Sequence, residues 1–99
     1  MASALQTSFG RWTLNTENGC LEINMSSLYQ IPLEKMTNSA PMLDWIFQLH
    51  EKSWATADDI REFIHAIYYI FGRGVASGGI DRTINAKDIL KKRYGCKFP

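Results

Sequence analysis

The chain has 99 residues and a formal net charge of +1, and 45% of its residues are hydrophobic and 12% aromatic. This length allows one hydrophobic core, and the composition excludes an intrinsically disordered chain. Seven basic and two acidic residues follow Gly72, whereas residues 1–72 contain four basic and eight acidic residues. We therefore expect an acidic body with a basic C-terminal segment.

The first residues and the cysteines bear on the cellular compartment. Residues 1–6 lack the basic start and apolar run of a secretory signal, and no stretch reaches the ~18 apolar residues of a membrane span. Cys20 and Cys96 are too few for a secreted disulfide framework and do not have metal-ligand spacing. The sequence predicts a cytoplasmic protein with free thiols, without a cofactor, a bound metal or a membrane partner.

Residues 9–25 have the pattern of a β-hairpin. Asn18 and Gly19 are typical of a type I′ turn, in which both central residues have positive φ. A two-residue loop at this point places Leu14 opposite Ile23. The large apolar residues of both strands then share one face, as expected of a half-buried antiparallel sheet.

Residues 28–34 form the third predicted strand. Tyr29, Ile31 and Leu33 alternate with polar residues and with Pro32. Because proline cannot donate a hydrogen bond to a neighbouring strand, Pro32 predicts that this strand lies at the edge of the sheet, with the proline turned to solvent.

The first helix is expected to begin after Asn38 and Ser39, whose side chains can cap it. Its apolar arc spans about 200° and comprises Met42, Leu43, Trp45, Ile46, Phe47, Leu49 and His50. That arc is too wide for one contact, so the helix is expected to lie between the sheet and a second helix, or to leave part of the arc to a partner. His50, in the middle of the stripe, is expected to be a core imidazole.

The second helix is expected to begin at Thr56, which forms a variant of the capping box with Asp59, and to end at Gly72. Its apolar stripe comprises Ile60, Phe63, Ile64, Ile67, Ile70 and Phe71. Residues 73–83 are interpreted as a flexible loop, and residues 85–94 as a short helix that Gly95 ends.

These elements predict an α+β fold in the order β-β-β-α-α, with a possible short C-terminal helix. The three-stranded antiparallel sheet consists of the hairpin and the edge strand, and the two amphipathic helices pack on one of its faces. We assign residues 1–72 to a compact domain, in which residues 1–8 are expected to be flexible. Residues 73–99 form the basic C-terminal segment, with a loop and the possible helix.

The predicted interaction surface centres on Tyr69, which projects from the polar side of the second helix. Arg61, Glu62 and His65 lie on the same side, and Trp45 lies at the edge of the first helix's arc. Tyrosine and tryptophan are the residue types that dominate interface hot spots. Alternatively, Tyr69 and Trp45 cap the edge of the core or lie against the C-terminal segment.

Function is predicted largely from what the sequence lacks, since it contains no nucleophile–base pair, metal cluster or nucleotide fingerprint. With no catalytic residue to assign, we favour a non-enzymatic protein–protein interaction module that associates with itself, as a homodimer. One alternative is a nucleic-acid-associated protein whose phosphate contacts would be Lys87, Lys91, Lys92 and Arg93. Another is an enzyme whose site assembles from distant residues.

The segments Leu43-Asp44-Trp45-Ile46-Phe47-Gln48 and Lys52-Ser53-Trp54-Ala55-Thr56 follow the hairpin that contains Trp12. With them the chain resembles small uncharacterised bacterial proteins of accessory genomes and integron gene cassettes. The similarity covers residues 9–72. It implies a bacterial, cytoplasmic protein from a mobile genetic element, and it assigns no activity and no site residue.

Overall fold

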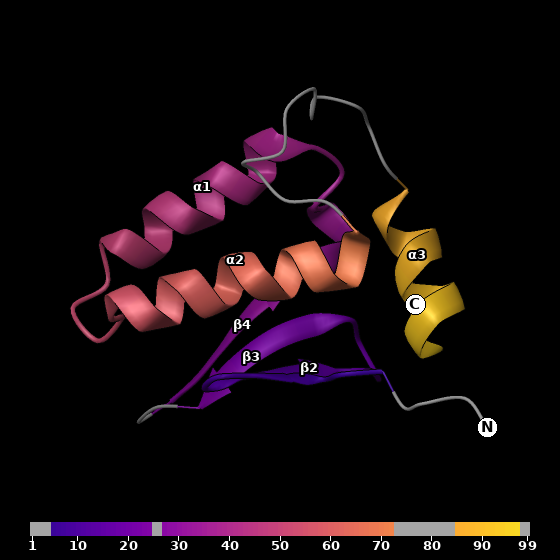
Figure 1. Cartoon of the computed structure of the whole chain (residues 1–99), viewed down its shortest axis with the longest axis horizontal. Coiled ribbons are helices and arrows are strands. Elements are labelled where there is room, and N and C mark those ends of the chain that lie inside the picture. Colours follow the sequence, from indigo (N-terminus) through magenta and orange to yellow (C-terminus); the bar gives the residue numbers. More distant parts are fainter. Residues whose placement is uncertain (1–4, 25–26, 73–84, 98–99) are drawn as a thin grey trace.

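A four-stranded antiparallel sheet and three α-helices make up the described part of the chain, residues 5–24, 27–72 and 85–97 of a computed structural model (Figure 1). The strands are β1 (Ser8–Phe9), β2 (Trp12–Asn15), β3 (Cys20–Asn24) and β4 (Leu28–Pro32), which pair in that order. The helices are the 3-10 turn η1 (Leu33–Lys35), α1 (Ser39–His50), α2 (Ala57–Phe71) and α3 (Ala86–Tyr94). The predicted α+β class and antiparallel sheet are confirmed. The predicted number of three strands is wrong.

The additional strand is β1, at the start of the described chain. Phe9 pairs with Trp12, so only Gly10 and Arg11 connect β1 to β2. Gly10 has a φ of 63°, and positive φ at the first central residue alone is the pattern of a type II′ turn. The Thr7 carbonyl also accepts a hydrogen bond of 2.7 Å from the Leu14 N–H. Ser8, and Thr7 through this bond, therefore extend the sheet into the segment that was expected to be flexible.

The register of the β2–β3 hairpin differs from the prediction by two residues. Leu14 lies opposite Leu21, not Ile23, and the loop contains the four residues 16–19. Because side chains alternate with a period of two, a shift of two residues leaves the predicted apolar face unchanged. Trp12, Leu14, Leu21 and Ile23 are all buried.

The turn that sets this register is not type I′. Gly19 has a φ of 69°, but no described residue other than glycine has a positive φ, and Asn18 therefore lacks the conformation that a type I′ turn requires. The Gly19 N–H donates to the Asn15 carbonyl instead, at 2.8 Å, and the Asn18 side chain accepts from the Cys20 N–H. These local bonds stabilise a longer loop.

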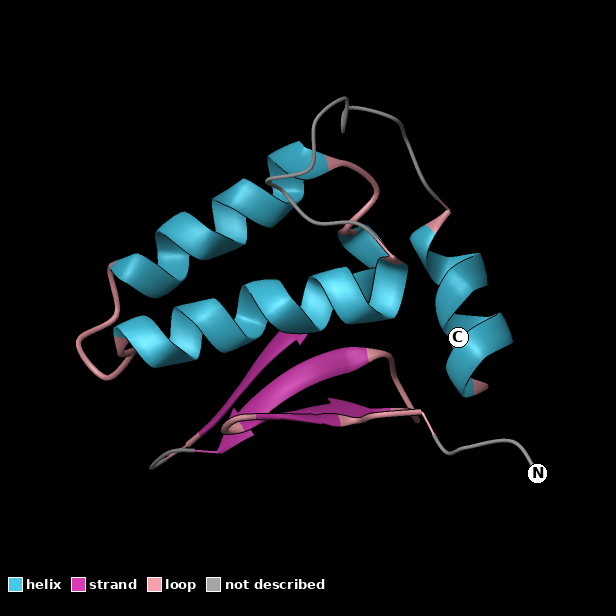
Figure 2. Ribbon diagram, viewed as in Figure 1, coloured by secondary structure: helices cyan, strands magenta, loops and turns pink. Residues whose placement is uncertain are grey.

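Helices α1 and α2 lie on one side of the sheet, as predicted (Figure 2). The α2 caps are confirmed. Thr56 and Asp59 form the capping box, and Gly72 ends the helix with a left-handed φ of 73°. Strand β4 is confirmed as an edge strand, although it ends at Pro32, and Leu33 begins η1.

Helix α1 packs through a different part of its arc from the one predicted. Met42 and Leu49 are buried, whereas Leu43, Phe47 and His50 are exposed. The core imidazole predicted at His50 is wrong. The arc is so wide that periodicity cannot identify which edge turns inward, and in the folded chain the edge with Met42 and Leu49 does.

The predicted short C-terminal helix is confirmed as α3. Asn85 caps it by accepting a hydrogen bond from the Asp88 N–H, and Gly95 ends it. Ala86, Leu90 and the following Cys96 are buried in the same hydrophobic core as the sheet and α2. The loop predicted at residues 73–83 lies outside the described residues. None of the described helices is both long and apolar enough to cross a membrane.

Candidate interaction surfaces

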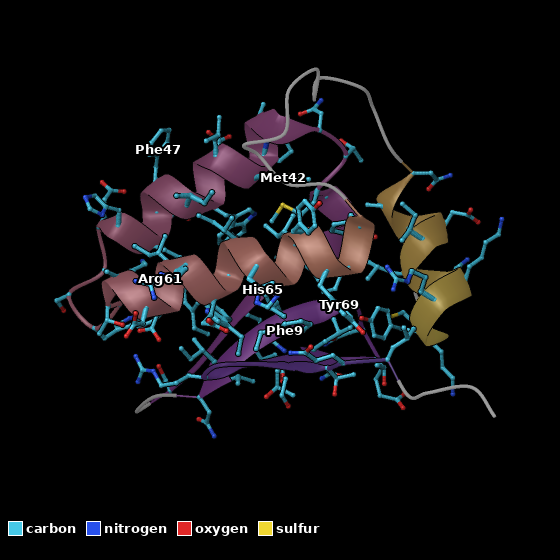
Figure 3. The ribbon with its side chains drawn as sticks, in the orientation of Figure 1. Phe9, Met42, Phe47, Arg61, His65 and Tyr69 are labelled. Atoms are coloured by element: carbon cyan, nitrogen blue, oxygen red, sulfur yellow. The ribbon has the colours of Figure 1, made fainter. Side chains whose placement is uncertain are left out.

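The side of α2 that was predicted to meet a partner packs mainly against β1. The Tyr69 ring lies 5.6 Å from that of Phe9, and its hydroxyl accepts a hydrogen bond of 3.1 Å from the Gln6 N–H. His65 meets Phe9 edge-on, with ring centroids 6.1 Å apart. Figure 3 shows His65 and Tyr69 of α2 beside Phe9. Tyr69 is half-buried, so its expected exposure is wrong.

Tyr69 also contacts the C-terminal helix, as the alternative interpretation of this residue predicted. The Arg93 guanidinium lies 5.6 Å from the Tyr69 ring centre and donates hydrogen bonds to the Tyr69 and Ile70 carbonyls, at 2.9 and 2.8 Å. These carbonyls belong to the last turn of α2, where main-chain acceptors have no partner within the helix. Arg93 thus stabilises the end of α2.

Glu62 lies against the turn that joins β1 to β2. A Cβ atom at Gly10 would lie 2.7 Å from the Glu62 Cγ, so this close approach, together with its positive φ, requires glycine at position 10. The predicted pair of Glu62 and His65 is present at 4.0 Å between Oε2 and Nδ1. Arg61 is exposed and pairs at 3.1 Å with the exposed Asp58. Surface pairs of this type contribute little to stability.

Trp45 belongs to an aromatic cluster around Tyr29. The Trp45 ring centre lies 6.4 Å from that of Tyr29. The ring centres of Trp54 and Trp12 lie 5.1 and 6.5 Å from the Tyr29 ring centre. Lys52 Nζ lies 5.6 Å from the same ring. The Tyr29 hydroxyl is buried, bonds to no other described residue, and has a pKa that burial raises. Trp45 and Trp54, both half-buried, cover the inner side of β4.

An ion pair that the sequence did not reveal joins the β1–β2 turn to α2. Arg11 Nε donates to Asp59 Oδ1 at 2.9 Å, and a second nitrogen of the guanidinium donates to Oδ2. Asp59 is only 4% exposed, and the Arg11 hydrogen bond holds its pKa below the usual range. The Trp12 indole N–H donates to the Asp59 main-chain carbonyl at 2.8 Å. These contacts position β2 against the start of α2.

The largest exposed apolar side chain of α1 is Phe47, which is 62% exposed and points away from α2 and the sheet (Figure 3). Leu43, one turn earlier on the same side of the helix, is 39% exposed. We call these two residues the α1 strip. Tyr68 of α2 and Leu28 of β4 are also exposed.

The basic residues of α3 have intramolecular contacts. Lys87 Nζ lies 3.9 Å from Glu34 Oε2, and Lys92 Nζ lies 3.2 Å from Asp88 Oδ2. Both lysines are exposed, as are Lys91 and Arg93, although the Arg93 guanidinium also bonds to α2 as described above. Of the four predicted phosphate contacts, the three lysines therefore have ammonium groups that solvent can reach.

The described residues do not bring three or more histidine, cysteine or acidic side chains together as metal ligands. Cys20 and Cys96 are both free thiols, and burial raises the pKa of each. Comparisons with protein-family models, with curated proteins and with solved structures found no match.

Proposed function

We propose that the protein is a non-enzymatic interaction module that associates with a second copy of itself through the α1 strip. The observation that carries this proposal is the 62% exposure of Phe47, one turn from the exposed Leu43, on a helix whose Met42 and Leu49 face the core. Exposed apolar residues that lie together are typical of protein interaction sites, and aromatic residues dominate such contacts. A bacterial, cytoplasmic setting, as the cassette resemblance implies, belongs to the same proposal.

The charges of α1 favour a second copy in antiparallel orientation. Its first turn contains no acidic residue, and Glu51 stands at its C-terminal cap, next to the negative end of its own helix dipole. In an antiparallel pair around a two-fold axis, Leu43 lies opposite Phe47 of the second copy. Glu51 then lies near the positive end of the other α1, where a carboxylate is stabilised.

Phe47→Asp is expected to weaken self-association by about 2 kcal/mol or more, roughly thirtyfold in Kd, because it puts a charge at the centre of the apolar contact. Light scattering across micromolar concentrations measures the change. The melting temperature of the dilute protomer should hardly move, since Phe47 is exposed. Gln48→Asp, which adds the same charge at the exposed neighbouring position, is the control and should associate as the parent does. A parent protein that stays monomeric would contradict the proposal.

A second candidate function is binding of nucleic acid by α3, supported by the exposure of Lys87, Lys91 and Lys92 on one short helix. With three phosphate contacts, the logarithm of the association constant plotted against the logarithm of the salt concentration would have a slope of about −2 to −3. Lys91→Glu with Lys92→Glu should abolish retention on a heparin column at low salt. A parent protein that flows through that column would remove this candidate.

A further inference from the structure

The two edges of the sheet differ in how they are covered. At the β1 edge, the Gln6 N–H donates to the Tyr69 hydroxyl, and the Tyr94 hydroxyl donates to the Gln6 carbonyl at 3.0 Å. At the β4 edge, no described residue makes a comparable contact with the main chain of Leu28 or Gln30. Leu28 is 53% exposed, and Gln30 is also exposed. One edge is therefore closed by side chains, and the other is open within the described structure.

Hydrogen-bond alternation shows which main-chain groups face this open edge. The Leu33 N–H donates to the Gly19 carbonyl at 3.1 Å, in register with the pairing of Ile31 and Leu21. Since successive residues of an antiparallel strand bond to opposite sides, the odd-numbered residues of β4 bond to β3. The N–H and C=O groups of Leu28 and Gln30, and the carbonyl of Pro32, point outward.

We propose that β4 pairs antiparallel with β4 of a second copy, around a two-fold axis at Gln30. The two Gln30 residues then exchange N–H···O=C bonds, and each Leu28 N–H donates to the Pro32 carbonyl of the other copy. Each exposed Leu28 side chain packs against Pro32 of the other copy on the outer face of the sheet. In this register Pro32, which has no N–H, lies outside the central pair of hydrogen bonds that the two Gln30 residues exchange.

A second copy fits this edge better than a generic extended peptide, because the arrangement is self-complementary on both faces. On the inner face, Tyr29 comes opposite Ile31 of the other copy, next to the half-buried Trp45 and Trp54. The joined sheet ends at two β1 edges, which Tyr69 and Tyr94 already cover, so pairing leaves no open edge. The β4 contact does not involve the α1 strip. A chain that uses both the β4 contact and the α1 contact is joined to two other copies.

The test uses the full chain with Phe47→Asp, which removes the α1 contact, and measures mass by light scattering at up to about 100 μM. This variant is expected to be a dimer. Adding Gln30→Pro, which deletes the outward N–H, should give a monomer, with Kd raised at least tenfold. Adding Gln30→Ala is the matched control, because it also loses the side-chain bond to Glu22 but keeps the N–H, and it should remain dimeric.

Amide hydrogen exchange supplies a second measurement that does not depend on the proline variant folding. In the Phe47→Asp dimer, the Leu28 and Gln30 amides should exchange slowly, and dilution to monomer should accelerate them at least tenfold while Leu14 stays protected. A monomeric Phe47→Asp variant with fast exchange at Leu28 and Gln30 would overturn the β4 contact and leave the α1 proposal standing. Unchanged mass in Phe47→Asp, together with loss of dimer in Gln30→Pro alone, would overturn the α1 proposal instead.

Discussion

Trp12→Ala is expected to lower the free energy of unfolding by about 3–5 kcal/mol, the range for deleting a fully buried aromatic side chain. Trp12 is 0% exposed, its ring centre lies 5.5 Å from that of Phe63, and its indole N–H bonds to the Asp59 carbonyl. The substitution would therefore leave a cavity between β2 and α2 and remove the indole hydrogen bond to the first turn of α2. Urea denaturation at one fixed, low protein concentration measures the loss without a contribution from self-association.

Trp12→Phe separates the two contributions. It keeps most of the ring packing against Phe63 but removes the N–H, so its loss should be about 0.5–1.5 kcal/mol, the scale of one hydrogen bond. Equal losses for the phenylalanine and alanine variants would show that ring packing contributes little at this site.

Asp59→Ala is expected to destabilise the fold by about 2–4 kcal/mol, because Asp59 both pairs with Arg11 and forms the capping box with Thr56. The estimate lies below that for a wholly buried pair, since the Arg11 side chain is 47% exposed and stays partly hydrated. Asp58→Ala removes the neighbouring carboxylate of the same helix turn, which is exposed, and should cost no more than about 0.5 kcal/mol. Similar losses for both variants would contradict a specific role of the Arg11–Asp59 pair.

The Asp59 effect should also depend on pH. Arg11 lowers the pKa of Asp59 in the folded state below that of the unfolded chain. The unfolded protein therefore binds more protons in acid, and the stabilisation is fully present above about pH 4, the unfolded pKa. As the pH falls below that value and through the folded pKa, the stabilisation is lost. The difference in stability between parent and Asp59→Ala should be constant from pH 7 to about pH 5 and shrink below about pH 4.

Local signals in the sequence predicted the elements whose structure depends on local bonds. Thr56 with Asp59 and the stop at Gly72 define α2 because caps and helix stops act within one turn. Pro32 predicted the edge position of β4, since a missing N–H is tolerated only there. The buried face of the hairpin was also correct despite the wrong register, because alternation is insensitive to a shift of two.

What the sequence could not predict depends on contacts between distant segments. Strand β1 has only two residues, too few for an alternating pattern, so its packing against α2 left no periodic signal. For that reason the sequence pattern gives Tyr69 no core partner, although Phe9 and Gln6 contact it in the folded chain. The Gly10 turn was the one local signal for β1, since Gly at the first central position is typical of a two-residue hairpin loop.

The candidate surfaces were predictable in kind but not in place. The sequence indicated that α1 has more apolar surface than one contact can bury, and Phe47 and Leu43 are that excess. The sequence did not indicate which part of the apolar surface of α1 would stay exposed, because that depends on how Trp45 packs against Tyr29 of β4. Residue type alone pointed to Trp45, which lies against Tyr29 of β4, beside the open edge of the sheet.

The hydrogen bond from Tyr94 to Gln6 joins residues separated by 88 positions, which matters while the chain is being synthesised. At ribosomal rates of about 5–20 residues per second, Tyr94 is added roughly 4–18 s after Gln6. Before Tyr69 is added, neither of the side chains that cover Gln6 exists, although the N-terminal hairpins can already pair. A nascent chain therefore presents two uncovered strand edges at once, the state in which unwanted strand pairing between chains is most probable.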